Sequence, residues 1–271
     1  MDFLVSNTKA KIIYYGHDLH FLREMREYEL TGDEKTKENS EHWKVKELKL
    51  MRQADVVYYP SQIEADIINE IEADINVKAI PAYIFDDSKK SIEYEMNNRS
   101  GVMFIGGFGH KPNVDAVIWY VQEVLPHVLE KNDTIKTYIL GSNPPKEIQE
   151  LASNNVIIKG FVTDEELEQF YRRCRMSIVP LRYGAGIKGK VIEGMYNQIP
   201  ILTTSVGAEG ILNSEDSLVV VDDAKEYAEA LANLYEDEEK LKDLSAHSLQ
   251  YVKENYSMKK VEEIVGADFD F

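Results

Sequence analysis

From residue 101 to about residue 235, short apolar runs alternate with helix-like segments, and this alternation most constrains the fold. The runs are almost entirely hydrophobic, which is typical of parallel strands that are covered on both faces. Glycines follow several of them, as in Gly106-Gly107 and Gly141. The pattern predicts an α/β domain in which helices cover both faces of a parallel sheet. We expect its strands at residues 102–105, 135–140, 156–159, 176–180, 199–202 and 218–221.

The first 90 residues predict a smaller α/β unit. Strands are expected near residues 11–15, 56–59 and 77–80, with helices at 18–29, 34–54 and 61–73. A full doubly wound domain usually has five or six strands, so this unit is expected to be incomplete at its N-terminal side. The predicted architecture is therefore α/β with two Rossmann-like units. We assign residues 1–90 to the first unit, 91–100 to a linker, 101–255 to the second unit and 256–271 to a C-terminal tail.

Composition narrows the classes of partner and the compartment. A net charge of −17 argues against nucleic acid as a partner, because a phosphate backbone requires clustered lysine and arginine. No apolar run approaches 18 residues and no signal peptide pattern is present, so we expect a cytoplasmic protein without a membrane span. The single cysteine, Cys174, precedes an apolar run and is expected in the core. Basic residues at 172, 173 and 175 leave peripheral membrane association open.

A glycine- and lysine-rich loop is the strongest chemical signal in the chain. It lies in LRYGAGIKGKVIEGMYNQIPILTTSVGAEGI at 181–211, between a predicted strand and a predicted helix. Gly184, Gly186 and Gly189 let the backbone approach a ligand closely. Lys188 and Lys190 add positive charge where the N-terminus of the helix already favours anions. The loop predicts an anion site, most naturally for a phosphorylated small molecule.

Several motifs together resemble the retaining glycosyltransferases of group 1, a large family with the GT-B fold that uses nucleotide-sugar donors. The resemblance covers most of residues 11–235 and extends to relatives that build O-antigen-type polysaccharides. The matching motifs are YYGHDLHFLREMREYELTGD at 14–33, ADVVYYPSQIEADII at 54–68, FIGGFGHKPNVDAV at 104–117, YILGSNPP at 138–145, IIKGFVTDEELEQFYRRCRMSIVPLRYGAGIKGKVIEGM at 157–195 and IPILTTSVGAEG at 199–210.

The resemblance implies which residues hold the diphosphate. Lys188 and Lys190 are expected to neutralise it and to stabilise the departing group, with Gly189 at the start of the helix beside them. Gly106 and Gly107 are expected to let the backbone approach the diphosphate across the cleft. An ordinary strand-to-helix turn is the structural alternative for these two glycines.

His110, with Lys111, matches a position where relatives place a basic residue near the phosphate. Glu193 is expected to accept hydrogen bonds from the ribose hydroxyls. Its structural alternative is a glutamate that faces solvent. Glu209 is expected to contact donor hydroxyls. Metal cofactors are not expected, because the family type relies on lysine and the helix dipole.

Residues 160–162 are expected to meet the base. Gly160, Phe161 and Val162 stand where the backbone of relatives contacts it, although a hydrophobic strand end explains them equally well. The one Asp-x-Asp motif, at 268–270, is interpreted as a disordered or docking tail.

His17 matches the histidine of the acceptor-side domain that contacts the donor sugar beside the reaction centre. His20 is the alternative, and both also have a structural explanation. Arg23 and Arg26 follow on one predicted helix, where pairing with neighbouring glutamates predicts a salt-bridged helix surface.

Two departures from the family pattern matter. Ala185 occupies the position of a second acid, eight residues before Glu193, that holds the donor sugar in relatives. The family's N-terminal domain also normally opens with strands and a glycine-rich loop that precede the part matched here. The chain is thus expected to be a fragment, a split enzyme that needs a second chain, or a degenerate nucleotide-sugar binder.

Three functional hypotheses follow. The leading one is a retaining glycosyltransferase that moves a sugar from a UDP-, GDP- or dTDP-sugar to a glycan or lipid-linked glycan acceptor in surface polysaccharide synthesis. The second is a non-catalytic module that binds a nucleotide sugar or stabilises a partner transferase. The third is a sugar-nucleotide epimerase, for which the flanking acids are not found. The sequence does not name the base, the sugar, the acceptor or the oligomeric state.

Overall fold

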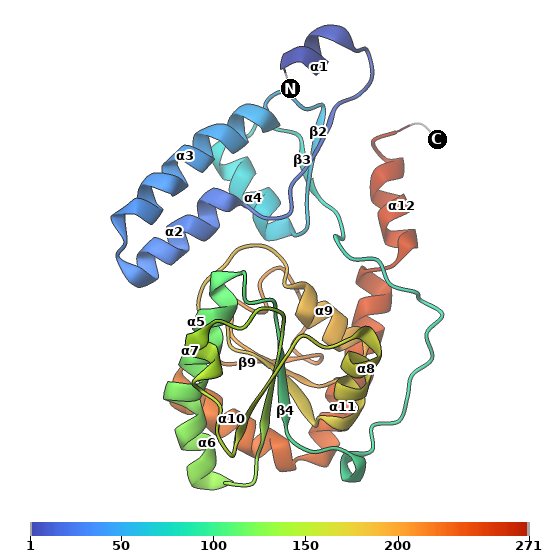
Figure 1. Ribbon diagram of the computed structural model, residues 1–271. Coiled ribbons are helices and arrows are strands. Elements are labelled where there is room, and N and C mark those ends of the chain that lie inside the picture. Colours follow the sequence, from blue (N-terminus) through green and yellow to red (C-terminus); the bar gives the residue numbers. More distant parts are fainter. Residues whose placement is uncertain (1, 270–271) are drawn as a thin grey trace.

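The computed structural model describes residues 2–269 as two α/β units, with the smaller one above the larger one in Figure 1. The first unit has a three-stranded parallel sheet in the order β1-β2-β3. The middle strand β2 is buried along its whole length, whereas β1 lies at an edge. Its elements are α1 (Asp2–Asn7), β1 (Ile13–Tyr15), α2 (His20–Thr31), α3 (Glu34–Met51), β2 (Val56–Tyr59), α4 (Gln62–Ile71) and β3 (Val77–Ala79).

The second unit contains a six-stranded sheet in the order β6-β5-β4-β7-β8-β9, with every pair parallel. Its strands are β4 (Val102–Ile105), β5 (Thr137–Leu140), β6 (Val156–Gly160), β7 (Met176–Val179), β8 (Ile201–Thr203) and β9 (Val219–Val220). The chain moves outward from β4 to β6 and then returns to place β7 on the other side of β4. Loops therefore diverge where β4 and β7 end, and ligands of such sheets bind in the crevice formed there.

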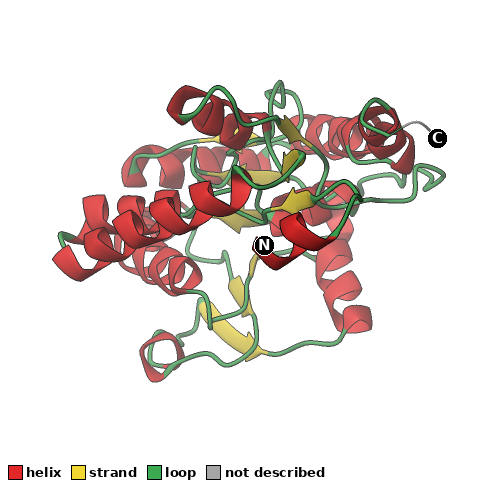
Figure 2. Ribbon diagram, turned by 90° about the horizontal axis from the view of Figure 1, so that it is seen from above, coloured by secondary structure: helices red, strands yellow, loops and turns green. Residues whose placement is uncertain are grey.

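Helices lie on both sides of the strands, as Figures 1 and 2 show. The predicted α/β fold class is therefore confirmed. The helices of the second unit are α5 (Lys111–Trp119), a π-helical turn (Tyr120–Val124), α6 (Leu125–Lys131), α7 (Lys146–Gln149), α8 (Asp164–Arg173), α9 (Gly189–Tyr196), α10 (Ala224–Glu236) and α11 (Glu238–Asn255).

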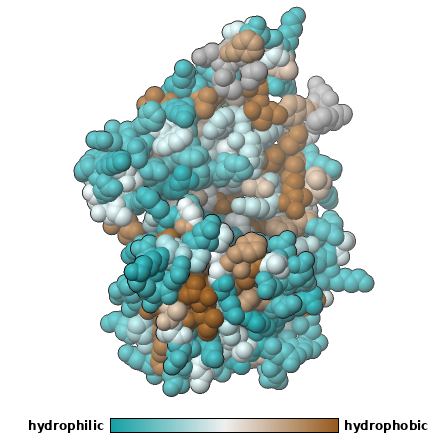
Figure 3. Space-filling view, in the orientation of Figure 1, coloured by the Kyte–Doolittle hydropathy of each residue, from teal (hydrophilic) through white to brown (hydrophobic). Residues whose placement is uncertain are grey.

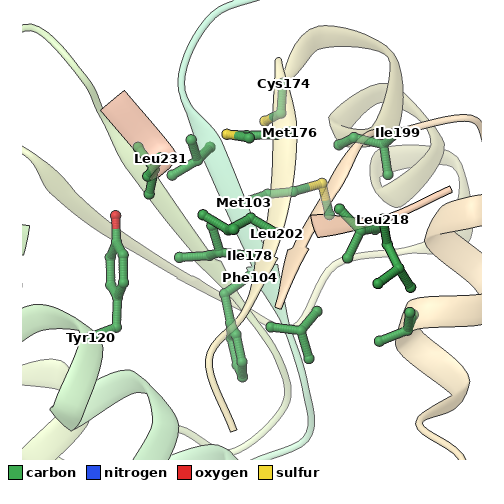
Figure 4. Close-up of a cluster of buried hydrophobic side chains, with 14 of the residues drawn as sticks. Met103, Phe104, Tyr120, Cys174, Met176, Ile178, Ile199, Leu202, Leu218 and Leu231 are labelled. Atoms are coloured by element: carbon green, nitrogen blue, oxygen red, sulfur yellow. The ribbon is translucent and has the colours of Figure 1, made fainter. Parts of the chain in front are cut away.

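The core of the second unit forms between the sheet and these helices. Met103, Phe104, Ile178 and Leu202 come from three adjacent strands and point into one cluster (Figure 4). Cys174 belongs to the same cluster, as expected, and burial raises the pKa of its thiol to about 12. Burial of these apolar side chains is the main force that holds the sheet to its helices.

The predicted single helix over residues 113–129 is interrupted. It consists of α5, the π-helical turn and α6, with Pro126 in the first turn of α6. Proline fits this position because the N–H group that it lacks has no partner within the helix there. The expected break at Pro126 is therefore the start of a new helical segment.

The C-terminal segment returns to the first unit. After α11, helix α12 (Met258–Gly266) packs Val261, Ile264 and Val265 against the sheet face formed by Val56 and Tyr58. Helices α2, α3 and α4 cover the opposite face. Residues 256–269 thus form a docked helix and its end.

Asp268 fixes the end of this segment. It accepts a hydrogen bond from the Tyr58 hydroxyl at 2.6 Å and pairs with Lys78. The Asp-x-Asp motif therefore begins with a residue that holds the C-terminal segment against the first unit. Asp270, its other acid, lies outside the described residues.

The connection between the units is also anchored. It contains one 3₁₀ turn (Met96–Asn98). The Ile92 amide donates to Gln198 Oε1 at 2.8 Å, and the Tyr94 hydroxyl donates to the Arg175 carbonyl at 2.7 Å. The segment assigned as a linker at 91–100 therefore runs along the second unit.

We expect Ile264→Asp to destabilise the protein, because a carboxylate at this position loses apolar contact with the sheet and is poorly solvated. The predicted loss is about 1–3 kcal/mol of unfolding free energy. Chemical denaturation followed by circular dichroism measures it. Glu262→Ala on the exposed side of the same helix is the matched control, and equal stability of the two variants would contradict the docking described here.

Candidate functional site

The loop after β7 and the start of α9 form one wall of a cleft between the two units. Gly184 and Gly186 have φ values of +143° and +71°, which side chains disfavour, so glycine is needed for this path. Helix α9 begins at Gly189, and its first-turn N–H groups carry the positive end of the helix dipole. A side chain at Gly189 would collide with Tyr83, whose hydroxyl lies 2.6 Å from the point where its Cβ atom would stand. The helix start is thus enclosed by the segment between the units.

A cavity of about 360 Å³ lies at this point. It is lined from both units, and four of the expected site residues meet there in addition to Gly189. These are His17, His110, Lys188 and Lys190. Other lining residues include Asp18, Arg23, Tyr83, Asn113, Tyr183 and Ala185. The expectation that the glycine-lysine loop and the acceptor-side histidine face a common space is thus consistent with the structure.

Lys190 is held in a partly apolar pocket. Its Nζ donates to Asn113 Oδ1 at 2.6 Å and lies 4.5 Å from the centre of the Phe104 ring. Burial, followed by the charge on Lys188, lowers the pKa of Lys190 to about 7. A lysine in this setting gains from a nearby anion, because the anion restores its preference for the charged form.

Gly106 is required for this arrangement. A Cβ at Gly106 would lie 2.5 Å from Lys190 Nζ and 2.8 Å from the Asn113 side chain. The neighbouring Gly107 carbonyl accepts from Asn113 Nδ2 at 2.8 Å. The two glycines therefore stand beside the expected anion site, at the end of β4, and Gly106 leaves the space that Lys190 occupies.

Lys188 and Glu209 link the loop to the first unit. Lys188 Nζ lies 3.3 Å from Glu209 Oε2 and also donates to the Gly186 carbonyl. Arg26 of α2 approaches Glu209 from the other side, with Nη2 2.7 Å from Oε1 and Nη1 2.9 Å from Oε2. Arg26 Nη1 also donates to the Gly184 carbonyl at 2.6 Å. One buried carboxylate thus joins a cation from each unit.

The expectation for Arg23 and Arg26 is wrong. Rather than pairing with glutamates of their own helix, Arg26 pairs with Glu209 and Arg23 pairs with Asp18. Both arginines lie on the face of α2 that meets the cleft. Spacing of charges along one helix cannot reveal such contacts, since Arg26 and Glu209 are 183 residues apart.

The two histidines of the HDLH motif have different surroundings. His17 is exposed and lines the cavity. His20 Nδ1 lies 3.0 Å from Glu47 Oε1, and its ring stacks on Trp43 with centroids 4.6 Å apart. The structure therefore favours His17 over His20 as the residue that faces a ligand.

His110 lies across the cavity from His17. Burial, then the positive charges of Arg23 and Lys190, lower the pKa of His110. Its neighbour Lys111 instead points to the first unit, with Nζ 2.7 Å from Glu27 Oε1. Of the expected basic pair, His110 is therefore the one in the cavity.

Glu193 lies in an adjoining hollow of about 540 Å³. Gly189, Lys190 and Tyr83 line both this hollow and the cavity, so the two spaces meet at the start of α9. Burial, followed by the charge on Asp164, raises the pKa of Glu193. The half-buried carboxyl is thus open to a ligand that extends from Lys190 along α9.

Residues 160–162 are at the end of β6, and none of them lines the cavity or the adjoining hollow. The Gly160 carbonyl accepts from the Gly141 amide at 2.8 Å, and the Phe161 side chain is 75% exposed. Their expected contact with a base stays a prediction.

Within residues 2–269, no helix has the length and hydropathy needed to cross a membrane. Across the same residues, no group of three or more His, Cys, Asp or Glu side chains is arranged to hold a metal ion. Most of the surface seen in Figure 3 is hydrophilic, in agreement with the high charge of the chain.

Comparison with known proteins identifies the family. The family model described as "Glycosyl transferases group 1" matches residues 99–237, just over half of the chain. The chain belongs to the group 1 glycosyltransferases. The predicted family is therefore confirmed, and the match lies on the unit that carries the glycine-lysine loop.

A curated relative adds a genomic setting. A Klebsiella pneumoniae protein, described as an uncharacterized 44.6 kDa protein in the cps region, is 29% identical over 177 residues. The match covers 62% of this chain and 45% of the relative. The chain thus spans less than half the length of this relative.

Solved glycosyltransferases share the fold. TarM from S. aureus, in a complex with fondaparinux, α-GlcNAc-glycerol and UDP, has a TM-score of 0.73 at 15% identity, covering 95% of this chain and 51% of its own. Sucrose-phosphate synthase from Thermosynechococcus elongatus has a TM-score of 0.76 at 16% identity, covering 98% and 69%. HepE from Anabaena, in complex with UDP-glucose, has a TM-score of 0.68 at 13% identity, covering 96% and 72%. The two units therefore form a GT-B-like fold.

We expect Arg26→Ala to loosen the contact between the units, because Glu209 loses its bidentate partner and stays buried beside Lys188 alone. The predicted loss of stability is about 1–3 kcal/mol, with a larger radius of gyration in small-angle X-ray scattering. The matched control is Arg52→Ala, which breaks the exposed Arg52–Glu72 pair within the first unit and should leave the radius unchanged. An unchanged radius in Arg26→Ala would contradict the bridging role of Glu209.

Proposed function

We propose that this group 1 glycosyltransferase transfers a sugar from a nucleotide-diphosphate donor to a hydroxyl of a glycan acceptor, with retention of anomeric configuration. The observation that carries the proposal is the cavity in which Lys188 and Lys190 flank the N-terminus of α9. Backbone N–H groups, a helix dipole and two ammonium groups converge there, and they suit a diphosphate. TarM and HepE, which share the fold, have been solved with UDP or UDP-glucose.

In this proposal each group has a physical task. Lys190 and Lys188 bind the diphosphate and stabilise the negative charge that develops as the bond to the sugar breaks. Glu193 accepts hydrogen bonds from the ribose, since it lies in the hollow next to Lys190. Residues 160–162 meet the base beyond it. Glu209, held between Lys188 and Arg26, contacts the donor, and His17 orients the sugar from the opposite unit.

The wider setting is proposed on the same footing. The acceptor is a growing surface glycan, free or lipid-linked, because the curated relative is encoded in a cps region. The reaction takes place in the cytoplasm and uses no metal, since lysines and the helix dipole supply the positive charge. A second chain that completes the first unit remains part of the proposal.

A second candidate function is a non-catalytic module that binds a nucleotide sugar. Two observations favour it. Ala185 lines the cavity without a polar side chain, and the sheet of the first unit has three strands among the described residues. Release of nucleotide from a bound nucleotide sugar, with and without glycan acceptors, separates the two functions. A transferase accelerates release when the acceptor is added, whereas a module binds the donor without turnover.

We expect the chain to bind one of UDP, GDP or dTDP in isothermal titration calorimetry without added metal, and Lys190→Ala to weaken this binding at least tenfold. The loss of one charge-assisted contact accounts for a change of this size. Lys136→Ala is the matched control, because Lys136 is exposed at the other end of the sheet. If none of the three nucleotides binds, or if both variants behave alike, the proposed site is wrong.

Binding should also depend on pH. The pKa of free Lys190 is lowered to about 7, so the free protein carries a neutral amine above that pH. A diphosphate prefers the charged form, and its affinity should therefore fall between about pH 7.5 and 9.5, by up to about tenfold per pH unit. The phosphate itself is fully ionised in this range.

Lys190→Arg provides the control for this dependence, since arginine stays charged at every pH of the series. Its nucleotide affinity should vary little between about pH 7.5 and 9.5. The same decline in wild type and Lys190→Arg, or a flat wild-type profile, would show that Lys190 does not titrate at the binding site.

A further inference from the structure

The charges around the 360 Å³ cavity are strongly unbalanced. Its lining includes three cationic side chains, those of Arg23, Lys188 and Lys190. Among the described lining residues there is one carboxylate, that of Asp18. Asp18 belongs to the first unit, so the second unit's side of the cavity, as far as it is described, offers cations and backbone but no acidic side chain.

The fold places Asp18 directly against the glycine loop. It follows the end of β1, and the preceding Gly16 packs so closely on the Tyr59 ring that no side chain fits there. On the other side, a Cβ built at Gly186 would lie 3.2 Å from the Asp18 Cβ. Asp18 is thus wedged between the first sheet and the loop that carries Ala185 and Lys188.

One oxygen of Asp18 is fixed by the protein and the other is left for a ligand. Oδ2 accepts from Arg23 Nη1. Oδ1 accepts no hydrogen bond from any described residue, and His20 Nδ1 lies 3.6 Å from it. The side chain is 16% exposed, so it is oriented by its ion pair yet open to the cavity.

Glu64, another acid beside the loop, is different. It is fully buried and does not line the cavity. Its Oε1 accepts from the Leu19 amide at 3.2 Å, and its Oε2 lies 3.1 Å from Ser61 Oγ. Glu64 therefore has a structural role, and Asp18 is the acid with an oxygen available to a ligand.

We propose that Asp18 binds hydroxyl groups of the sugar in the nucleotide-sugar donor and thereby selects the sugar nucleotide over the bare nucleotide. The inference rests on the proposed function, in which the lysines take the diphosphate. A carboxylate repels a phosphate but accepts hydrogen bonds from hydroxyls, so the uncharged end of the ligand belongs at Asp18. The first unit thus supplies the acceptor group that Ala185 does not provide.

The test compares affinities for nucleotides and nucleotide sugars in wild type and Asp18→Asn. Titration calorimetry with UDP, GDP and dTDP identifies the base, and the matching probe among UDP-glucose, GDP-mannose and dTDP-rhamnose follows, without acceptor. The measured quantity is the ratio of the nucleotide Kd to the nucleotide-sugar Kd. Asn keeps the shape of Asp but replaces the accepting oxygens with one acceptor and one donor group.

We expect Asp18→Asn to keep the affinity for the bare nucleotide within about threefold and to reduce the ratio about tenfold or more, as loss of a hydrogen bond to a charged group does. Asp18→Glu, which retains the carboxylate, should recover part of the ratio. Glu70→Gln on α4 removes the same charge at an exposed position and is the matched control.

The outcomes separate the two proposals. If wild type binds no nucleotide, both the proposed function and this inference fail. If it binds a nucleotide but Asp18→Asn leaves the ratio unchanged, the site stands and the role of Asp18 is refuted. If Asp18→Asn loses the bare nucleotide as well, Asp18 is needed for the shape of the site rather than for the sugar, and the inference is also refuted.

Discussion

Glu209 is the contact on which the geometry of the cleft depends. Its buried carboxylate is bound by Arg26 from the first unit and by Lys188 from the second. A buried carboxylate is strongly unfavourable without partners, so each cation both stabilises Glu209 and is positioned by it. The same contact brings α2 against the glycine loop through the Gly184 carbonyl. Closure of the units and shape of the cavity therefore follow from one ion cluster.

A second electrostatic constraint explains why the cavity suits an anion. Lys188 is neutralised by Glu209, whereas Lys190 has an uncharged partner in Asn113 and a lowered pKa. Among the described residues, Lys190 thus has no carboxylate partner, although it stands beside a helix N-terminus. A diphosphate removes this imbalance and replaces lost hydration with fixed donors, which is the arrangement that stabilises a departing phosphate. Function here draws on charge that folding alone leaves uncompensated.

The sequence predicted the parts of this account that depend on local pattern. Apolar runs and glycines indicated both α/β units, and the loop around Lys188 and Lys190 indicated the site, because strand, loop and helix are contiguous there. Contacts between distant segments were not predictable. Arg26 was expected to pair along its helix, and Asp18 was not noticed, since nothing in the local sequence shows that either faces the glycine loop. Docking of α12 on the first sheet was likewise hidden, because an amphipathic helix does not name its partner face.

The central claim is that the start of α9 binds the diphosphate of a nucleotide. The most direct measurement is a crystal structure of the protein with the nucleotide that it binds, without added metal. The account predicts phosphate oxygens at about 3 Å from Lys190 Nζ and from the first N–H groups of α9, with the ribose toward Glu193. Phosphates bound elsewhere on the protein, with the Lys188–Lys190 cavity free of nucleotide, would contradict it.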